Sequence, residues 1–404
     1  MGNLRYLTAG ESHGMGLTAI LEGVPAGLVI SEADIDYDLK RRQGGHGRGG
    51  RMKIEQDRIE FRSGVRWGET LGSPIALWIE NRDFANWREK MSTKAEDRDP
   101  SVVVSRPRPG HADLAGVLKY DREDIRDILE RSSARETTVR VAAGAICRKF
   151  LTEFGVDVLS HVVRLGEVAA PTAAPDVDLA DLRRRVEDSP VRCADPICSE
   201  KMVAHIDEVA REKDTLGGIV EIVATGLPIG LGSHVHWDRK LDSRIAGAVL
   251  SVQAMKGVEF GIGFEATSRR GSEVHDEIFY EGGRFRRSTN NAGGLEGGMT
   301  DGMPLVVRVA KKPISTVRKG LQSVDLKTKE PSQSTYQRSD VTAVPAAGVI
   351  LEAVIAFVLA DAMLEKFGGD SLRETKRNHQ TYLGQLQKAR VFEGQPTGDR
   401  QDSF

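Results

Sequence analysis

The chain has 404 residues, of which 39% are hydrophobic and 29% are charged, and its formal net charge at pH 7 is -2. This composition is ordinary for a folded globular protein and excludes a disordered or fibrous chain. The three cysteines have no CxxC spacing, so neither a disulfide framework nor a zinc site is supported, and we expect a cytoplasmic protein without a metal.

Short apolar runs predict five strands, at residues 4–9, 54–61, 75–79, 218–225 and 304–310. Three of these strands follow a Thr-x-Gly turn, at Thr70, Thr215 and Thr300. The shared turn suggests a supersecondary unit that is used repeatedly. Chance recurrence of turn-then-strand phrases in a glycine-rich chain is the alternative.

Fourteen residues between Lys40 and Lys53 carry six fixed positive charges, five glycines and no acidic residue. In a chain with a net charge near zero, such a segment either faces a strongly anionic ligand or repels itself into disorder. The first alternative predicts an anion site, and an RGG-like segment that binds RNA is a second way to use the same charge.

Helices are expected in the middle and near the end of the chain. Asp121 is expected to cap a helix that carries Ile125 and Ile128, and a longer helix is expected from about Thr137 to Gly155. The apolar run 344–364 contains two acidic residues and predicts a buried helix, not a membrane span.

The remaining segments are predicted to lie outside the core. Residues 169–200 are polar and proline-bearing, which predicts a peripheral excursion, and the residues after about 385 predict a solvated tail. No long linker divides the chain. We therefore expect an α+β fold with one catalytic domain over residues 1–384 and a polar tail over residues 385–404.

Two glycine-flanked histidines are candidates for chemistry. His13 lies in GESHG directly after a strand, where the backbone can turn sharply and direct the imidazole into a cleft. His111 lies in RPRPGHAD beside Arg106 and Arg108, a combination that suits a phosphate leaving group. A structural histidine and a solvent loop that caps the following helix are the alternatives.

Basic residues next to hydroxyls recur at three further places, RSSARET at 131–137, KKPIST at 311–316 and RSD at 338–340. Hydroxyls and backbone N–H groups at a helix start commonly hold phosphate, although a capping box explains the serines equally well. Neither a Walker loop nor a complete GxGxxG opening a βαβ unit is present, which disfavours ATP hydrolysis and a dinucleotide fold.

Taken together, these phrases resemble the chorismate synthase family. They occur in the family's order across about residues 4–380: GESHG at 10–14, RRQGGHGRGGRM at 41–52, SRPRPGHAD at 105–113, RSSARET at 131–137, NAGGLEGGMTDG at 291–302, KPIST at 312–316 and QRSDVTAVPAAGV at 337–349. The resemblance implies a βαβ sandwich with helices enclosed between antiparallel or mixed sheets, usually assembled as a homotetramer.

The implied activity is a lyase of the shikimate pathway that removes phosphate from 5-enolpyruvylshikimate 3-phosphate by a 1,4-anti elimination, giving chorismate for aromatic amino acid biosynthesis. The family requires reduced FMN, with NADPH as a possible reductant and an external flavin reductase as a possible partner. Substrate and cofactor are both anionic, which fits the basic segment. No nucleic acid or membrane partner is expected.

The resemblance also implies roles for single residues. His13 is expected to protonate or stabilise the reduced flavin, His111 to assist the leaving phosphate, and Asp340 to take part in proton transfer with support from Ser12. The implied flavin contacts are Arg131, Ser132, Ser133, Gln253, Ala254, Gly298, Lys312, Pro313, Ile314, Ser315, Thr316 and Arg338. The implied contacts to substrate or NADPH are Arg42, Arg48, Arg108 and Arg135.

Two other functions remain as alternatives. An RNA-binding protein would use the basic segment directly, but the low aromatic content of 5%, the acidic overall balance and the apolar flanks of the segment disfavour it. A flavin reductase would oxidise NADPH with free FMN, and the sequence leaves open whether this chain has that ability as well.

Overall fold

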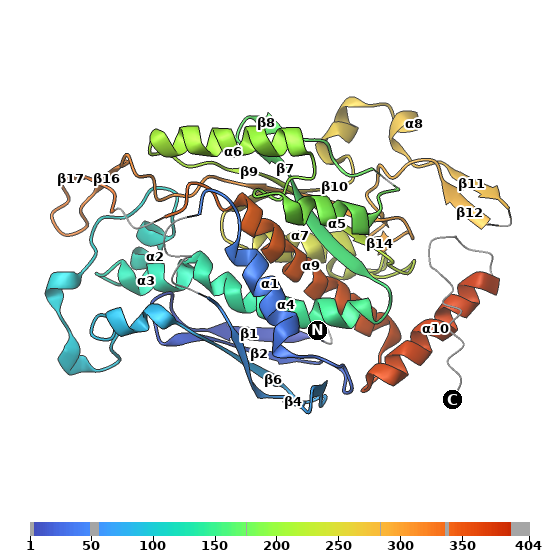
Figure 1. Cartoon of the computed structure of the whole chain (residues 1–404), viewed down its shortest axis with the longest axis horizontal. Coiled ribbons are helices and arrows are strands. Elements are labelled where there is room, and N and C mark those ends of the chain that lie inside the picture. Colours follow the sequence, from blue (N-terminus) through green and yellow to red (C-terminus); the bar gives the residue numbers. More distant parts are fainter. Residues whose placement is uncertain (1–3, 49–55, 175, 283, 336–338, 389–404) are drawn as a thin grey trace.

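The computed structural model describes residues 4–388 except 49–55, 175, 283 and 336–338. Two antiparallel sheets enclose a layer of helices (Figure 1), as the resemblance implied. The first sheet has the order β1-β2-β6-β3, formed by β1 (Arg5–Ala9), β2 (Gly16–Glu22), β6 (Ile75–Glu80) and β3 (Ile59–Ser63). The second has the order β10-β15-β9-β7-β8, formed by β10 (Met255–Phe260), β15 (Leu305–Lys311), β9 (Gly218–Thr225), β7 (Asp157–Leu165) and β8 (Val168–Ala169).

The two sheets repeat one topology. When β8 is left aside, each sheet places the first, second, fourth and third strand of its half of the chain side by side. Each half also contains a small hairpin before its last strand, β4 (Val65–Arg66) with β5 (Glu69–Thr70) in the first and β13 (Leu295–Glu296) with β14 (Met299–Thr300) in the second. The chain therefore consists of two structurally equivalent halves joined by a shared helical layer.

The predicted Thr-x-Gly unit is confirmed at two of its three positions. The Thr70 hydroxyl donates to the Pro25 carbonyl over 2.6 Å and accepts from the Leu28 amide over 3.0 Å. The Thr300 hydroxyl makes the same pair of bonds to the Pro228 carbonyl, 2.7 Å, and the Leu231 amide, 2.8 Å. The Thr215 hydroxyl instead donates to the Ile314 carbonyl, so this third turn is not part of the repeat.

Four helices fill the space between the sheets: α1 (Glu32–Gln43), α4 (Thr137–Thr152), α7 (Leu241–Leu250) and α9 (Val344–Phe367). α4 packs on the first sheet and α9 on the second, and the two helices also pack on each other. Among the described residues, α9 is the one helix long and apolar enough to cross a membrane, and its most apolar stretch is 94% buried inside the protein. The predicted buried helix is therefore confirmed.

The outer surface carries the other elements. The helices are α2 (Asp113–Tyr120), α3 (Arg126–Ser132), α5 (Leu179–Asp188), α6 (Pro196–Arg211), α8 (Gly271–Val274) and α10 (Leu372–Lys388). The remaining hairpins are β11 (Ile278–Glu281) with β12 (Arg284–Arg287), and β16 (Gln322–Val324) with β17 (Pro331–Gln333). In Figure 1, α6 lies above the second sheet; α6 contacts β8 and α5 contacts β7 of that sheet.

Four expectations differ from the structure. Asp121 does not begin a helix; it ends α2 in a left-handed conformation with φ 50°, and Asp124 accepts from the Arg126 amide at the start of α3. Of the strand expected at 54–61, residues 54 and 55 lie outside the described part of the chain, residues 56–58 are not in a strand, and β3 begins at Ile59. Segment 169–200 is not a mere excursion, because α5 buries Leu182 and Val186 against the second sheet. The predicted tail from 385 overlaps the end of α10, and residues 389–404 lie outside the described part of the chain.

Candidate functional site

The predicted site residues other than Gly298 and Arg338 gather at one end of the helical layer, where α1 and α7 end and α4 and α9 begin (Figure 1). Contacts between these ends are direct. Arg42 in α1 donates to the Thr137 hydroxyl at the start of α4, and Gln253 after α7 donates to Glu136 in the preceding turn. The Val341 amide before α9 donates to the Gly47 carbonyl in the basic segment.

His13 is buried and is held by several polar contacts. Its Nδ1 lies 2.9 Å from Oε2 and 3.0 Å from Oε1 of Glu130 in α3, and the Glu130 Oε2 atom also accepts from the His13 amide over 2.9 Å. The Trp87 ring lies against the imidazole with the two ring centroids 3.9 Å apart. The hydroxyl of the neighbouring Ser12 accepts from Ser133 over 3.2 Å. The GESHG turn is thereby joined to the segment between α3 and α4.

His111 has a carboxylate partner as well. Its Nδ1 lies 2.5 Å from Oδ1 of the buried Asp113, which also accepts from Arg108. Burial acts to raise the pKa of Asp113, but hydrogen bonds from His111 and Arg108 outweigh it and hold this pKa well below its usual range. Arg108 also reaches the Thr316 hydroxyl at 3.3 Å, so the loop at 105–113 meets the 312–316 segment.

Lys312 strengthens that junction, since its ammonium donates to the Gly110 carbonyl. The Lys312 amide donates to the carbonyl of Ala254, a residue with φ 70°. The Ile314 carbonyl accepts from Thr215, and Ser315 lies against Gly110. The KPIST phrase, including Pro313 between these contacts, therefore links the His111 loop to the end of α7.

Arg42 and Arg135 are both buried and share the carboxylate of Asp57. Arg135 donates to Asp57 Oδ1 over 2.6 Å, and Arg42 lies 3.7 Å from Oδ2. Arg42 also donates to the Ala134 carbonyl at 2.9 Å. These two guanidiniums therefore line the start of α4 and are not spread over the surface.

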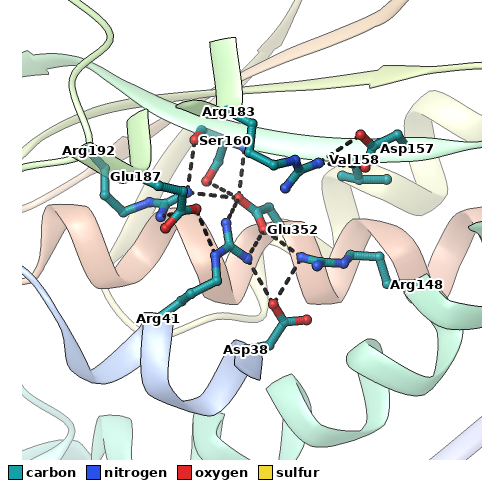
Figure 2. Close-up of polar contacts among 10 residues, drawn as sticks. All are labelled: Asp38, Arg41, Arg148, Asp157, Val158, Ser160, Arg183, Glu187, Arg192 and Glu352. Carbon is teal, nitrogen blue, oxygen red and sulfur yellow. Dashed lines mark hydrogen bonds and ion pairs between the residues drawn. The ribbon is translucent and has the colours of Figure 1, made fainter. Parts of the chain in front are cut away.

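The residue before Arg42, Arg41, belongs to a buried network of ion pairs (Figure 2). Arg41 donates to both oxygens of Glu352 in α9, over 2.7 and 3.0 Å, and to Asp38 within α1. Arg148 from α4 also donates to Glu352, and Arg192 lies 3.2 Å from it. The network therefore fixes the last turn of α1, and with it Arg42, relative to α4 and α9.

Part of the positive charge in the basic segment is buried inside the protein. Arg41 is 9% exposed and Arg42 is 6% exposed, so neither side chain is displayed at the surface. His46 lies 2.6 Å from Asp207. Among the described residues, the segment is thus tied into the protein, which counts against an RGG-like RNA-binding surface.

Arg48, Asp340 and Lys311 form a further charged group. Arg48 lies 3.3 Å from Asp340, and both act electrostatically on Lys311 at the end of β15. Burial, together with Arg48 and Lys312, lowers the pKa of Lys311 to about 8, although Asp340 opposes this. Positive charge therefore exceeds negative charge here, which is what an anion-binding site requires. Arg338, two residues before Asp340, lies outside the described residues.

The implied flavin residues fall into two places. Arg131 donates to the Thr8 carbonyl, the Ser132 hydroxyl donates to the Ile128 carbonyl, and the Ser133 hydroxyl accepts from the Arg135 amide, all beside the start of α4. Gln253 and Ala254 join them after α7. Gly298 is not brought to this group, because its carbonyl accepts from the Leu241 amide at the opposite end of α7.

Four residues at the site were not assigned a functional role from the sequence: Glu130, Asp113, Trp87 and Lys311. Glu130 and His13 are 117 residues apart, so no local spacing signals their pairing. Asp113 belongs to the SRPRPGHAD phrase, but no role beside His111 was predicted for it. Lys311 belongs to the KKPIST phrase but was given no role of its own, and Trp87 belongs to no phrase that indicates a ligand.

A pocket in the described structure lies elsewhere and contains none of the predicted site residues. It is lined by Phe260, Ile262, Gly263, Ala266, Val274, His275, Asp276, Asn291, Ala292 and Glu296. The chemistry of the site is therefore identified from its charged and titratable residues and not from the pocket.

Comparisons with known proteins agree with the geometry. A family model described as "Chorismate synthase" matches residues 4–364. A chorismate synthase of Syntrophotalea carbinolica is 56% identical over 96% of this chain and 100% of its own length, and one of Geobacter sulfurreducens is 57% identical over 94% and 98%. A crystal structure of a chorismate synthase superposes with a TM-score of 0.76 at 45% identity, covering 95% of this chain and 98% of that one. The chain belongs to the chorismate synthase family.

Proposed function

We propose that the protein removes phosphate from 5-enolpyruvylshikimate 3-phosphate by a 1,4-anti elimination, giving chorismate. The observation that carries the proposal is the 56% identity to a chorismate synthase along nearly the whole chain. The site adds a physical reason, since two histidines and several cations meet at one end of the helical layer. The activity is that of a carbon–oxygen lyase of aromatic amino acid biosynthesis.

The charge of the site supports an anionic substrate. The substrate brings a phosphate and two carboxylates, and Arg48, Lys311 and Lys312 provide a local surplus of positive charge. Arg108 provides a further guanidinium next to His111. A bound phosphate would offset the mutual repulsion of these cations, so substrate affinity is expected to fall as ionic strength rises.

We further propose that reduced FMN is the cofactor, with NADPH as its reductant or an external flavin reductase as its source. The residues fit such a ligand: Gln253 lies beside Ala254 and Lys312, and its Oε1 atom is buried without a hydrogen-bond partner among the described residues. That oxygen is available to accept from a ring N–H. When bound, the flavin supplies reversible electron transfer to the substrate.

The two histidines divide the proton and leaving-group chemistry. His13, whose Nδ1 faces Glu130, gives or takes a proton at Nε2. His111, which Asp113 and Arg108 hold in place, assists the departing phosphate. Asp340 can exchange a proton beside Arg48, and Ser12 supports the His13 turn through Ser133.

The test is phosphate release and chorismate formation from 5-enolpyruvylshikimate 3-phosphate under anaerobic conditions with pre-reduced FMN. Activity with pre-reduced FMN supports the proposal, and absence of activity in a folded protein that binds FMN contradicts it. A second reaction with oxidised FMN and NADPH decides whether the chain is also a flavin reductase. Salt-sensitive retention on RNA would favour the RNA-binding alternative instead.

Variants assign the histidines within that assay. His13→Ala and His111→Ala are each expected to lower turnover by about 10²–10⁴-fold, the usual contribution of a general acid or base. Intact turnover in either variant would remove that histidine from the mechanism.

A further inference from the structure

We propose that Glu130 is a positioning residue for His13: it accepts the Nδ1–H of the imidazole and so makes Nε2 the atom that faces the reacting molecules. The inference rests on the proposed function of His13. It adds a residue from α3 to the site, and it assigns the two ring nitrogens of His13 different duties.

Glu130 grips the His13 turn at several points. Both of its carboxylate oxygens lie within hydrogen-bond distance of Nδ1, at 2.9 and 3.0 Å, and one of them also accepts from the His13 amide at 2.9 Å. Its backbone carbonyl accepts from the Ser12 amide at 3.0 Å. One residue of α3 therefore fixes the backbone of the turn and the plane of the ring together.

The proton on Nδ1 follows from the ionisation of Glu130. Burial acts to raise the pKa of Glu130, but hydrogen bonds to His13 and the charge of Arg126 outweigh it and lower this pKa below its usual range. An ionised carboxylate only accepts hydrogen bonds, so Nδ1 must be the donor. The lone pair or proton at Nε2 is then the one available for chemistry.

Two neighbouring side chains keep this arrangement in place. Trp87 covers one face of the imidazole, with the planes inclined by 33°, and its indole N–H donates to Asp83 over 3.0 Å. Arg126 donates to Glu130 over 3.1 Å and lies over the Trp87 ring, 5.0 Å from its centroid. The imidazole is thus held at one edge and over one face, which leaves it little freedom to flip.

Glu130 itself is not expected to exchange protons with substrate. Its side chain is 3% exposed, and it lies on the Nδ1 side of the imidazole. A carboxylate in that place acts through the histidine, by orienting the ring and selecting its tautomer, as acidic partners of functional histidines commonly do.

The first experiment reads the tautomer directly. Imidazole ¹⁵N shifts of the full-length protein, assigned with His13→Gln, are expected to show that the neutral form of His13 carries its proton on Nδ1. A neutral form of His13 with its proton on Nε2 in the unmodified protein would overturn the proposal, whether or not any variant folds. In Glu130→Gln, whose amide both donates and accepts, the Nε2–H form is expected to appear; an unchanged His13 spectrum would contradict the inference.

Kinetics test whether Glu130 acts through His13. Glu130→Gln is expected to lower kcat about 10–100-fold, the usual effect of losing an orienting partner, with KM changed much less. In a His13→Ala background the same substitution is expected to have almost no further effect. Full, independent losses in the double variant would mean that Glu130 acts on something other than His13.

Two controls separate this inference from the proposed function. Glu123→Gln removes an exposed carboxylate shortly before α3 and is expected to leave both the spectrum and kcat unchanged. If His13→Ala retains full turnover while the Nδ1–H tautomer is present and depends on Glu130, the proposed role of His13 fails and the positioning inference stands.

Discussion

Glu352 lies in the middle of an apolar helix, yet it is 1% exposed and three guanidiniums surround it. Burial acts to raise its pKa, but Arg41, Arg192 and Arg148 outweigh this and hold the pKa of Glu352 well below its usual range. The same carboxylate accepts from the amide and hydroxyl of Ser160 in β7. A single residue therefore joins α1, α4, α9 and the second sheet (Figure 2).

Glu352→Gln is therefore expected to lower the free energy of unfolding by about 3–5 kcal/mol, because it leaves the buried Arg41 and Arg192 and the half-buried Arg148 without their common partner. Urea unfolding followed by circular dichroism measures the change. Glu365→Gln is the matched control in the same helix, since Glu365 is 34% exposed and binds Arg239 and Arg244 near the surface. The control is expected to change stability by at most about 1 kcal/mol. If the two variants lost equal free energies of unfolding, the buried network would stabilise the protein no more than an exposed ion pair does.

The same carboxylates predict how stability depends on pH. Glu352, Glu130 and Asp113 have lowered pKa values in the folded protein, so they bind fewer protons there than in the unfolded chain. Their contribution is fully present above the ordinary carboxyl pKa of about 4 and is lost as the pH falls through their folded values. Asp38, whose pKa burial raises, contributes with the opposite sign.

The free energy of unfolding is therefore expected to decrease as the pH is lowered below about 5. Urea titrations at pH 7, 5 and 4 measure it. In Glu352→Gln the decrease is expected to be smaller, so the difference between variant and parent narrows toward low pH. Parallel curves for the two proteins would contradict the assignment of this dependence to Glu352.

At the scale of elements, the crossing of α4 and α9 depends on a single glycine. A Cβ atom at Gly144 would lie 2.4 Å from both the Cβ and the carbonyl oxygen of Ala353, closer than real atoms approach. Gly247 in α7 is a natural comparison, since a Cβ atom there would meet nothing within 4 Å. An alanine at Gly247 would change helix propensity alone, whereas an alanine at Gly144 would also change the packing of α4 on α9.

Gly144→Ala is expected to lower the free energy of unfolding by about 1–3 kcal/mol, because overpacking exceeds the gain in helix propensity. Gly247→Ala is expected to raise it by about 0.5–1 kcal/mol, since alanine is the better helix former and has space there. Chemical denaturation of both variants gives the comparison. A stabilised Gly144→Ala protein would mean that the two helices separate easily.

The sequence predicted elements better than it predicted their partners. The strands at 218–225 and 304–310 and the helix at 344–364 stand out because their apolar runs are continuous and bounded by turn residues. α1 was not predicted, because Asp38 and Arg41 on its charged face are buried as an ion pair, and Arg41 is also paired with Glu352 from the far end of the chain. A local sequence pattern cannot indicate a partner so far away in the chain. For the same reason the pairing of Glu130 with His13 was not predicted.

At the scale of the whole molecule, the two equivalent sheets differ in what covers their outer faces. α5 packs Leu179, Leu182 and Val186 against Leu159 and Val223 of the second sheet. On the first sheet, Leu7 and Ile20 are paired across β1 and β2 and are 71% and 46% exposed. Among the described residues, no helix covers this face (Figure 1). An exposed apolar sheet face of this kind supports the expected homotetramer, because a second copy can pair with it about a two-fold axis.

Ile20→Lys is therefore expected to shift the protein toward smaller assemblies, since a charge placed on the face must be buried without a partner when two copies meet. Sedimentation velocity of the full-length protein at several concentrations measures the shift. Ile197→Lys is the matched control. Ile197 is 64% exposed on α6, which lies on the second sheet and not on the first. If both variants sediment like the parent, the first sheet's outer face is not an interface between copies. If only Ile20→Lys dissociates while its unfolding midpoint in urea is unchanged at low concentration, the uncovered sheet is where the copies meet.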